Sequence, residues 1–216
     1  MELNAIQKIA IFALPVIFAI TLHEAAHGYV ARMFGDRTAE MMGRISLNPL
    51  RHIDPIGTIL VPALTIFLGG ILFGWAKPVP VNFGNLRHPK RDMLWVAAAG
   101  PGANLLMAVF WAAMVKLAHL MSGSAYAEPL ALMGMAGVSI NAVLMALNLL
   151  PIPPLDGGRI AVSLLPPRAA YALSRVEPYG LFILLGLLFT GLLGALIGPL
   201  YQLVQTMALA LFGLNF

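Results

Sequence analysis

The chain contains no cysteine among its 216 residues, so it can form no disulfide bond, no thiolate zinc site and no thiol nucleophile. Charged residues are also scarce, at 10% of the chain against about 25% in an ordinary soluble domain. Hydrophobic residues make up 60%. This composition excludes an ordinary soluble globule, and any bound metal must be held by histidine, aspartate or glutamate.

The apolar residues are grouped in long blocks, each near or above the roughly 18 residues that span a bilayer. The blocks are 9–22, 56–76, 94–115, 129–150 and 181–214. The first block continues into Thr21-Leu22-His23-Glu24 without a small-residue cleavage site, which favours a retained helix over a secretory signal. We therefore predict an all-α polytopic membrane protein, in one domain over 1–216, with about four to six membrane helices.

The net charge of +4 has a simple source, because eleven of the thirteen lysines and arginines lie in three loops. These loops are 32–54, 77–93 and 151–177. Basic loops of this kind orient a membrane protein and remain in the cytoplasm. We therefore expect the chain to lie in a lipid bilayer and to bind no nucleic acid. All three basic loops should face the cytoplasm.

A metal-binding pattern stands in the first helix, at His23-Glu24-Ala25-Ala26-His27. In this H-E-x-x-H spacing both imidazoles project from one helix face and can share a zinc ion, while Glu24 can reach a water on the metal. Ionisable groups clustered on a membrane helix are kept when they are paired, bind metal or face a water cavity. A polar cluster satisfied by neighbouring helices, or an ion relay, is the alternative.

Catalytic zinc normally has three protein ligands and a water, so a third ligand must come from elsewhere. Asp156 has the best setting among the remaining candidates, because three prolines stop the preceding helix at 151–154 and two glycines follow the aspartate. Broken backbone at membrane depth is tolerated where it is packed in protein or lines a water-filled cavity. The alternative is an interfacial turn aspartate. His52 is expected to be structural.

Three sequence elements resemble the site-2 protease family of intramembrane zinc metalloproteases. They are His23-Glu-x-x-His27, Gly100-Pro101-Gly102-Ala103-Asn104, and Asn148-x-x-Pro151-x-x-x-x-Asp156-Gly157, in the family's order. The resemblance covers about 5–165, with further membrane helices at about 178–214, and shows no room for PDZ or CBS domains. It implies one zinc per chain, bound by His23, His27 and Asp156, with Glu24 as general base.

The resemblance also places Asn104 and Asn148 near the substrate, where an amide could donate to the oxyanion or hold the substrate backbone. Hydrogen bonding between helices is the alternative for both. The implied enzyme is a metalloendopeptidase of a prokaryotic cell membrane, with its site near the cytoplasmic side. Its implied partner is a single-span or membrane-proximal protein substrate, whose helix must unwind near the site. A divalent-metal or proton transporter using the same cluster is the competing hypothesis.

If His23, His27 and Asp156 share one zinc ion, the chain between them must cross the membrane an even number of times. His27 and Asp156 lie near helix ends that must be on one side of the membrane, yet three apolar blocks intervene, so one block does not cross. Because both its flanking loops are basic, block 56–76 is predicted to be re-entrant. Residues 75–83 alternate as an edge strand or form a plain loop. We expect Gly198-Pro199 to divide the tail into one span and an interfacial or short returning helix.

Overall fold

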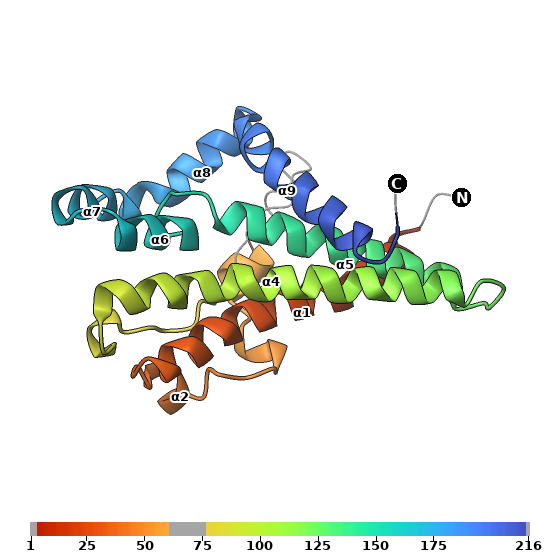
Figure 1. The fold of residues 1–216 in the computed structure, drawn as a ribbon, viewed down its shortest axis with the longest axis horizontal. Helices are drawn as coiled ribbons and strands as arrows, with labels where there is room; N and C mark the ends of the chain where they lie inside the picture. Colours follow the sequence, from red (N-terminus) through yellow and green to blue (C-terminus); the bar gives the residue numbers. More distant parts are fainter. Residues whose placement is uncertain (1–3, 61–76, 215–216) are drawn as a thin grey trace.

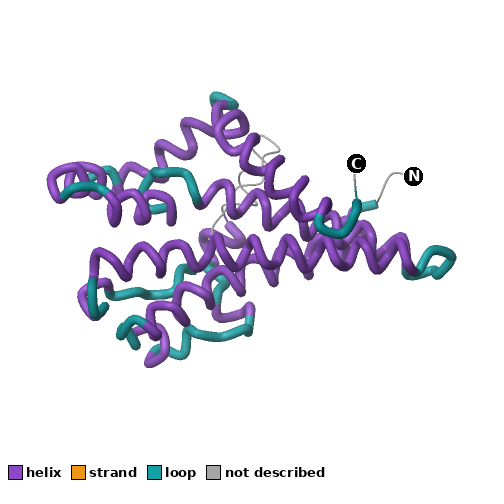
Figure 2. Tube along the Cα trace, viewed as in Figure 1, coloured by secondary structure: helices purple, strands orange, loops and turns teal. Residues whose placement is uncertain are grey.

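The computed structural model describes residues 4–60 and 77–214. Every regular element in these two stretches is a helix (Figures 1 and 2), which confirms the all-α prediction. Five helical stretches in them are long and apolar enough to cross a membrane, within the predicted four to six. The bounds of these stretches are Ile6–Met33, Pro89–Leu120, Ala127–Asn148, Pro167–Phe189 and Leu192–Ala210.

Three long helices form the centre of the molecule (Figure 1): α1 (Ala5–Met33), α4 (Pro89–Leu120) and α5 (Ala127–Asn148). Asn4 begins α1, because its side chain accepts a hydrogen bond from the Gln7 amide and the Gln7 side chain accepts one in return. Helix α1 ends where Gly35 adopts a left-handed φ of 113°. Helix α4 packs against both α1 and α5, so it is the central element around which the site is built.

Short elements connect and follow these helices. Between α1 and α4 lie α2 (Thr38–Met41), η1 (Pro49–Arg51), the π-helical turn η2 (Pro55–Leu60) and η3 (Phe83–Asn85). After α5 come α6 (Asp156–Leu164), α7 (Pro167–Ser174), η4 (Glu177–Tyr179), α8 (Gly180–Phe189) and α9 (Leu192–Ala210). Helix α6 packs on α4 and so returns the chain to the central helices, whereas α9 packs on α4 and α5.

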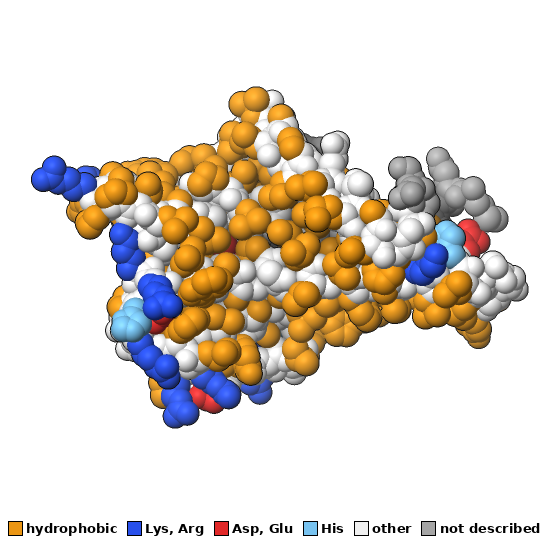
Figure 3. Space-filling model, in the orientation of Figure 1, with side chains coloured by type: hydrophobic (Ala, Val, Ile, Leu, Met, Phe, Trp, Pro, Cys, Tyr) orange, Lys and Arg blue, Asp and Glu red, His pale blue; other side chains and the backbone are white. Residues whose placement is uncertain are grey.

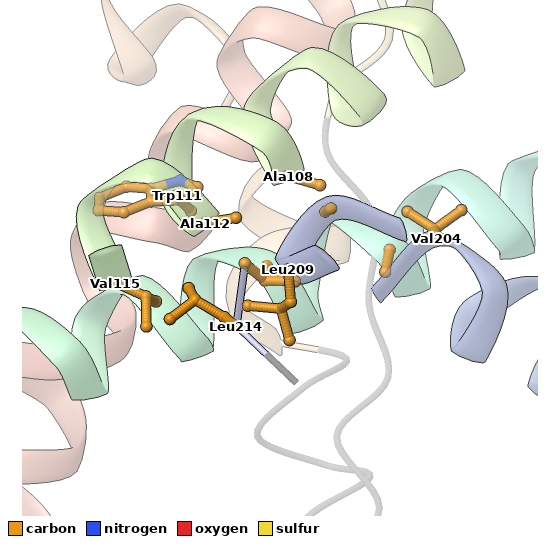
Figure 4. Close-up of a cluster of buried hydrophobic side chains, with 10 residues drawn as sticks. Ala108, Trp111, Ala112, Val115, Val204, Leu209 and Leu214 are labelled. Atoms are coloured by element: carbon orange, nitrogen blue, oxygen red, sulfur yellow. The ribbon is translucent and has the colours of Figure 1, made fainter. Parts of the chain in front are cut away.

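The apolar core joins α4, α5 and α9 (Figure 4). Trp111 of α4 lies against Gly137 of α5, where an added Cβ would stand 2.1 Å from the indole ring. Small residues at such contacts let membrane helices approach closely, which is the main source of packing energy when lipid is as apolar as the helices. The buried members of the core are Ala108, Trp111, Ala112, Val115, Val138, Ala142, Val204, Ala208, Leu209 and Leu214.

The predicted re-entrant segment lies mostly outside the described residues, since 61–76 are not described. The chain on its two sides is joined, because the Lys77 amide donates to the His52 carbonyl oxygen at 2.9 Å. A re-entrant segment needs its two ends on one side of the membrane, and this hydrogen bond agrees with that requirement. Residues 77–82 follow without strand pairing in the described part of the chain, so the edge-strand alternative is not observed for them.

The tail departs from the prediction. The break falls at Gly191, whose φ of 75° ends α8, and Pro199 lies inside α9. In Figure 1, α8 and α9 together carry the chain from the end where α6 and α7 lie to the end where both termini lie, so no short helix returns. The prediction of a break at Gly198-Pro199 was wrong because a membrane helix tolerates proline, whereas a left-handed residue stops the helical path.

Lysine and arginine side chains gather at the end of the molecule where α2, α6 and α7 lie, next to a wide hydrophobic band (Figure 3). The loop between α4 and α5 lies at the opposite end (Figure 1). The basic loops therefore share one end of the molecule, as the charge pattern predicted.

Candidate metal centre

Two histidines of α1 face α4 and α6 from one side of the helix. His23 and His27 are 7% and 9% exposed, and their Nε2 atoms lie 3.1 Å apart, as the i, i+4 spacing predicts. The two rings meet edge to face, at an interplanar angle of 83°. Both imidazoles thus point into one small buried volume.

The other ring nitrogen of each histidine is held by an oxygen of α4. His23 Nδ1 lies 2.6 Å from Asn104 Oδ1, and His27 Nδ1 lies 2.7 Å from the Val96 carbonyl oxygen. Both oxygens can only accept, so each Nδ1 carries the proton and each Nε2 keeps its lone pair. Two lone pairs then face each other, an arrangement that a shared cation would stabilise.

A buried amide pair fixes the orientation of Asn104. Its Nδ2 donates to the Ala19 carbonyl at 3.2 Å and to Asn141 Oδ1 at 2.9 Å, while Asn141 Nδ2 donates to the Gly137 carbonyl at 2.8 Å. Asn104 and Asn141 are both fully buried. Both amide hydrogens of Asn104 are thus committed, which favours the alternative of helix-to-helix hydrogen bonding over a substrate contact. Asn141 was not predicted, although an amide in the middle of the apolar block 129–150 was a signal for it.

Asp156 reaches the two histidines from the first residue of α6. Its Oδ2 lies 3.2 Å from His23 Nε2, and its Oδ1 lies 3.3 Å from His27 Nε2. The turn before it is tight, since a Cβ on Gly157 would stand 2.3 Å from the Leu149 carbonyl oxygen. Glycine at this position therefore lets the chain fold back at the end of α5 and aim the carboxylate at α1.

The three side chains fit a zinc ion. One donor atom from each lies within 4.8 Å of the others. The two imidazole nitrogens are 3.1 Å apart, and each lies 3.2 to 3.3 Å from a different oxygen of Asp156. These separations are close to the edge of about 3.3 Å of a tetrahedron with zinc–nitrogen bonds of about 2.0 Å. Asp156 Oδ2 is buried, and its polar neighbour His23 Nε2, at 3.2 Å, carries no proton in the tautomer described above. Buried polar atoms are rarely left without a hydrogen-bond partner, and a cation held between these donors would satisfy this oxygen.

Gly100 allows α4 to approach the histidines. A Cβ at this position would lie 2.4 Å from His27 Nε2 and 2.6 Å from His23 Nε2. Side chains other than hydrogen would therefore enter the volume in which the donor atoms meet. This contact gives a physical reason for the first glycine of Gly100-Pro101-x-x-Asn104.

Glu24 lies beside the donor cluster and outside it. Its half-buried carboxylate accepts a hydrogen bond from the Val79 amide at 2.7 Å. Residues 77–82 are therefore brought to the site although they are far from it in the sequence. Asp36, three residues after the end of α1, holds the same segment, because its Oδ2 accepts a hydrogen bond from the Asn82 amide at 2.7 Å.

Asp36 is fully buried in a loop outside the candidate membrane spans. Burial raises the pKa of its carboxyl, but hydrogen bonds from the Thr38 side chain and amide, the Asn82 amide and the Asn85 side chain more than compensate. The net effect is a pKa below its usual value, so Asp36 is ionised at neutral pH.

The remaining predicted residues lie around this centre. His52 is outside the cluster and buried, with Nε2 bonded to the Ser46 carbonyl at 2.9 Å, as expected of a structural histidine. Asn148 is half-buried and donates to the Leu144 carbonyl at 3.0 Å through Nδ2. Its predicted contact with substrate stays a prediction.

Comparison with known proteins places this geometry in context. The family model described as "Peptidase family M50" matches residues 111–191. A protein of Bacillus subtilis (strain 168), named "Putative zinc metalloprotease YwhC", is 38% identical over 204 residues, which cover 93% of this chain and 90% of that protein. No solved structure matches the chain.

Proteins named "Putative zinc metalloprotease Rip2" are also similar. The one from Mycolicibacterium smegmatis is 33% identical over 81% of this chain and 64% of its own length. The one from Mycobacterium tuberculosis (strain ATCC 25618 / H37Rv) is 32% identical over 87% of this chain and 70% of its own length. These names do not favour the transporter hypothesis.

Proposed function

Because the chain belongs to peptidase family M50, the zinc metalloproteases of the site-2 type, we propose that it cleaves peptide bonds inside or beside the membrane. The observation that carries this proposal is the convergence of three buried donors, from α1 and α6, beside the carboxylate of Glu24. The substrates are single-span or membrane-proximal segments of other proteins. The site faces the cytoplasmic side of a prokaryotic cell membrane, where the basic loops lie.

His23, His27 and Asp156 are the residues that we assign to one zinc ion per chain. A zinc ion held there would supply the Lewis acidity that activates a water near neutral pH and polarises the scissile carbonyl. The protein's part is to hold the three donors close together in a buried position. Asn104 and Val96 do this for the imidazoles, since each fixes one Nδ1 and thereby directs the opposite nitrogen inward.

Glu24 is the general base in this proposal. The Val79 amide fixes Oε2, so Oε1 is the oxygen that takes a proton from the attacking water and later passes it to the leaving amine. The helical segment of the substrate must unwind before cleavage, because a helix hides its peptide bonds. Asn148, close to the turn that carries Asp156, is the amide that we propose to contact the unwound backbone or the oxyanion.

An apolar groove of about 390 Å³ lies between α1, α4 and residues 45–47. Its apolar lining supports the proposal that the substrate is a membrane-embedded segment. Residues of α1 and α4 that flank the histidine-bearing face contribute to its walls. Its lining includes Leu22, Ala25, Ala26, Tyr29, Ile45, Leu47, Ala103, Leu106 and Met107. An apolar side chain of the substrate could occupy it at little cost.

The decisive experiment compares wild type with Glu24→Gln on a panel of membrane-span peptides, with and without chelator. Glu24→Gln keeps shape and polarity but removes the basic oxygen, so cleavage should stop while zinc stays bound. Glu40→Gln is the matched control, because Glu40 pairs with Arg32 and Arg37 far from the cluster and should leave cleavage unchanged.

Ligand assignment is tested in the same preparations by zinc analysis. Asp156→Ala should lose zinc, and His52→Ala should keep it. Undiminished cleavage by Glu24→Gln would remove Glu24 as the base, and zinc flux without cleavage by wild type would replace the protease with a transporter.

A further inference from the structure

Arg44 lies in the loop after α2 and is only 8% exposed. Its Nη2 donates to two consecutive carbonyl oxygens, those of Lys77 at 3.0 Å and Pro78 at 3.3 Å. The Arg44 amide donates to the Ala39 carbonyl at 2.8 Å, so the arginine is itself anchored to α2. A charged donor is thus buried against the segment that contacts the general base.

The contacts of Arg44 and Glu24 meet at one peptide group. The Pro78 carbonyl accepts from Arg44, and the amide hydrogen of the same peptide, that of Val79, is donated to Glu24 Oε2 at 2.7 Å. A peptide group whose oxygen binds a cation is a stronger donor at its nitrogen, because hydrogen bonds in a chain polarise one another. The cation and the carboxylate are therefore coupled through a single rigid plane.

Among the described residues, few other hydrogen bonds hold this plane. Proline at 78 and 80 removes the amide hydrogens on both sides of Val79, so these positions cannot donate to a neighbour. The Lys77 amide donates to the His52 carbonyl, and the Lys77 carbonyl accepts from Arg44. Arg44 is accordingly the side chain that orients the Pro78–Val79 peptide toward Glu24.

We propose that Arg44 is a positioning residue for Glu24 and acts through the Pro78–Val79 peptide. The inference rests on the proposed function, in which Glu24 is the general base. Arg44 contacts none of His23, His27 and Asp156 in the hydrogen bonds described for it, so it sets the direction of the base without holding the metal. Its effect belongs to the chemical step.

The first test measures kcat, KM and zinc content for Arg44→Ala, Arg44→Lys and Arg37→Ala. In Arg44→Ala we expect kcat to fall about tenfold, equivalent to about 1.4 kcal/mol, at unchanged KM and unchanged zinc content. Arg44→Lys should recover part of the loss because an ammonium can still donate to a carbonyl. Arg37→Ala is the control, since Arg37 is an exposed arginine paired with Glu40.

A double-mutant cycle tests the route through the peptide. Val79→Pro removes the amide hydrogen, and Val79→Ala keeps it while removing most of the side chain. If Arg44 acts through this amide, Arg44→Ala should lower kcat in the Val79→Ala background but cause no further loss in the Val79→Pro background. Additive losses in both backgrounds would overturn the proposed route.

A third measurement needs neither zinc nor substrate. In zinc-free protein labelled with ¹⁵N-valine, the Val79 amide proton, assigned by its absence in Val79→Ala, should move upfield in Arg44→Ala because the amide is less polarised. This inference alone would be refuted if Arg44→Ala cleaved substrate as fast as wild type, or if its lower activity were explained by loss of zinc. Absence of cleavage by wild type would instead refute the proposed function.

Discussion

Replacing Gly100 by alanine should impair zinc binding and cleavage, because the added methyl group would enter the space between α4 and the two histidines. The added Cβ would stand 2.4 Å from His27 Nε2, 2.5 Å from His23 Cε1 and 2.6 Å from His23 Nε2. Ordinary van der Waals contact begins at 3.4 Å, so α4 and the imidazoles must separate by about 1 Å. The three contacts come from two rings that are themselves held by Asn104 and Val96, so neither ring can rotate away freely.

The expected magnitude follows from this displacement. Overpacking of a well-packed contact costs about 1–3 kcal/mol of stability. Misplacement of reacting groups by about 1 Å lowers the rate about 100-fold. Gly100→Ala should therefore remain folded but lose zinc on dialysis and cleave membrane-span peptides about 100 times more slowly than wild type.

Gly102→Ala is the matched control, because it makes the same substitution in the same helix two residues further on. An added Cβ there meets no atom of the described residues within 4 Å, and alanine is the better helix former by about 0.5–1 kcal/mol. Its zinc content and cleavage rate should equal those of wild type. Full zinc content and full activity in Gly100→Ala would refute the argument that α4 and α1 meet as closely as described.

Two further predictions concern the loops. Asp36→Asn should lower the thermal unfolding temperature at pH 7, because an amide cannot accept all of the hydrogen bonds that the carboxylate receives. Since the native pKa of Asp36 lies below 3.8, the stabilisation by its carboxylate is present above that pH and is lost as the pH falls below it. The melting temperatures of wild type and Asp36→Asn should therefore converge in strong acid. A difference that stays constant with pH would contradict the role given to the Asp36 carboxylate. Single cysteines at positions 40, 85 and 170 should be labelled from the cytoplasm and one at 124 from outside, and labelling of 40 and 85 from opposite sides would rule out the re-entrant topology.

Much of the architecture could be predicted from the sequence because membrane helices are a local property. Apolar length predicts a span, and α1, α4 and α5 form where the blocks 9–22, 94–115 and 129–150 lie. The pairing of His23 with His27 is equally local, since residues four apart share a helix face. The prolines at 151–154 and the glycines after Asp156 pointed to this residue, and the structure brings its carboxylate to both histidines.

Long-range contacts decided what the sequence could not. The break in the tail depends on the left-handed Gly191 rather than on Pro199, and no local pattern separates the two. The fixed tautomers of His23 and His27 depend on oxygens of α4, about 70 to 80 residues away in the chain. The link from Arg44 to Glu24 passes through a backbone peptide, so it has no side-chain signature. Periodicity reports which face a residue occupies, whereas helix packing alone determines what that face meets.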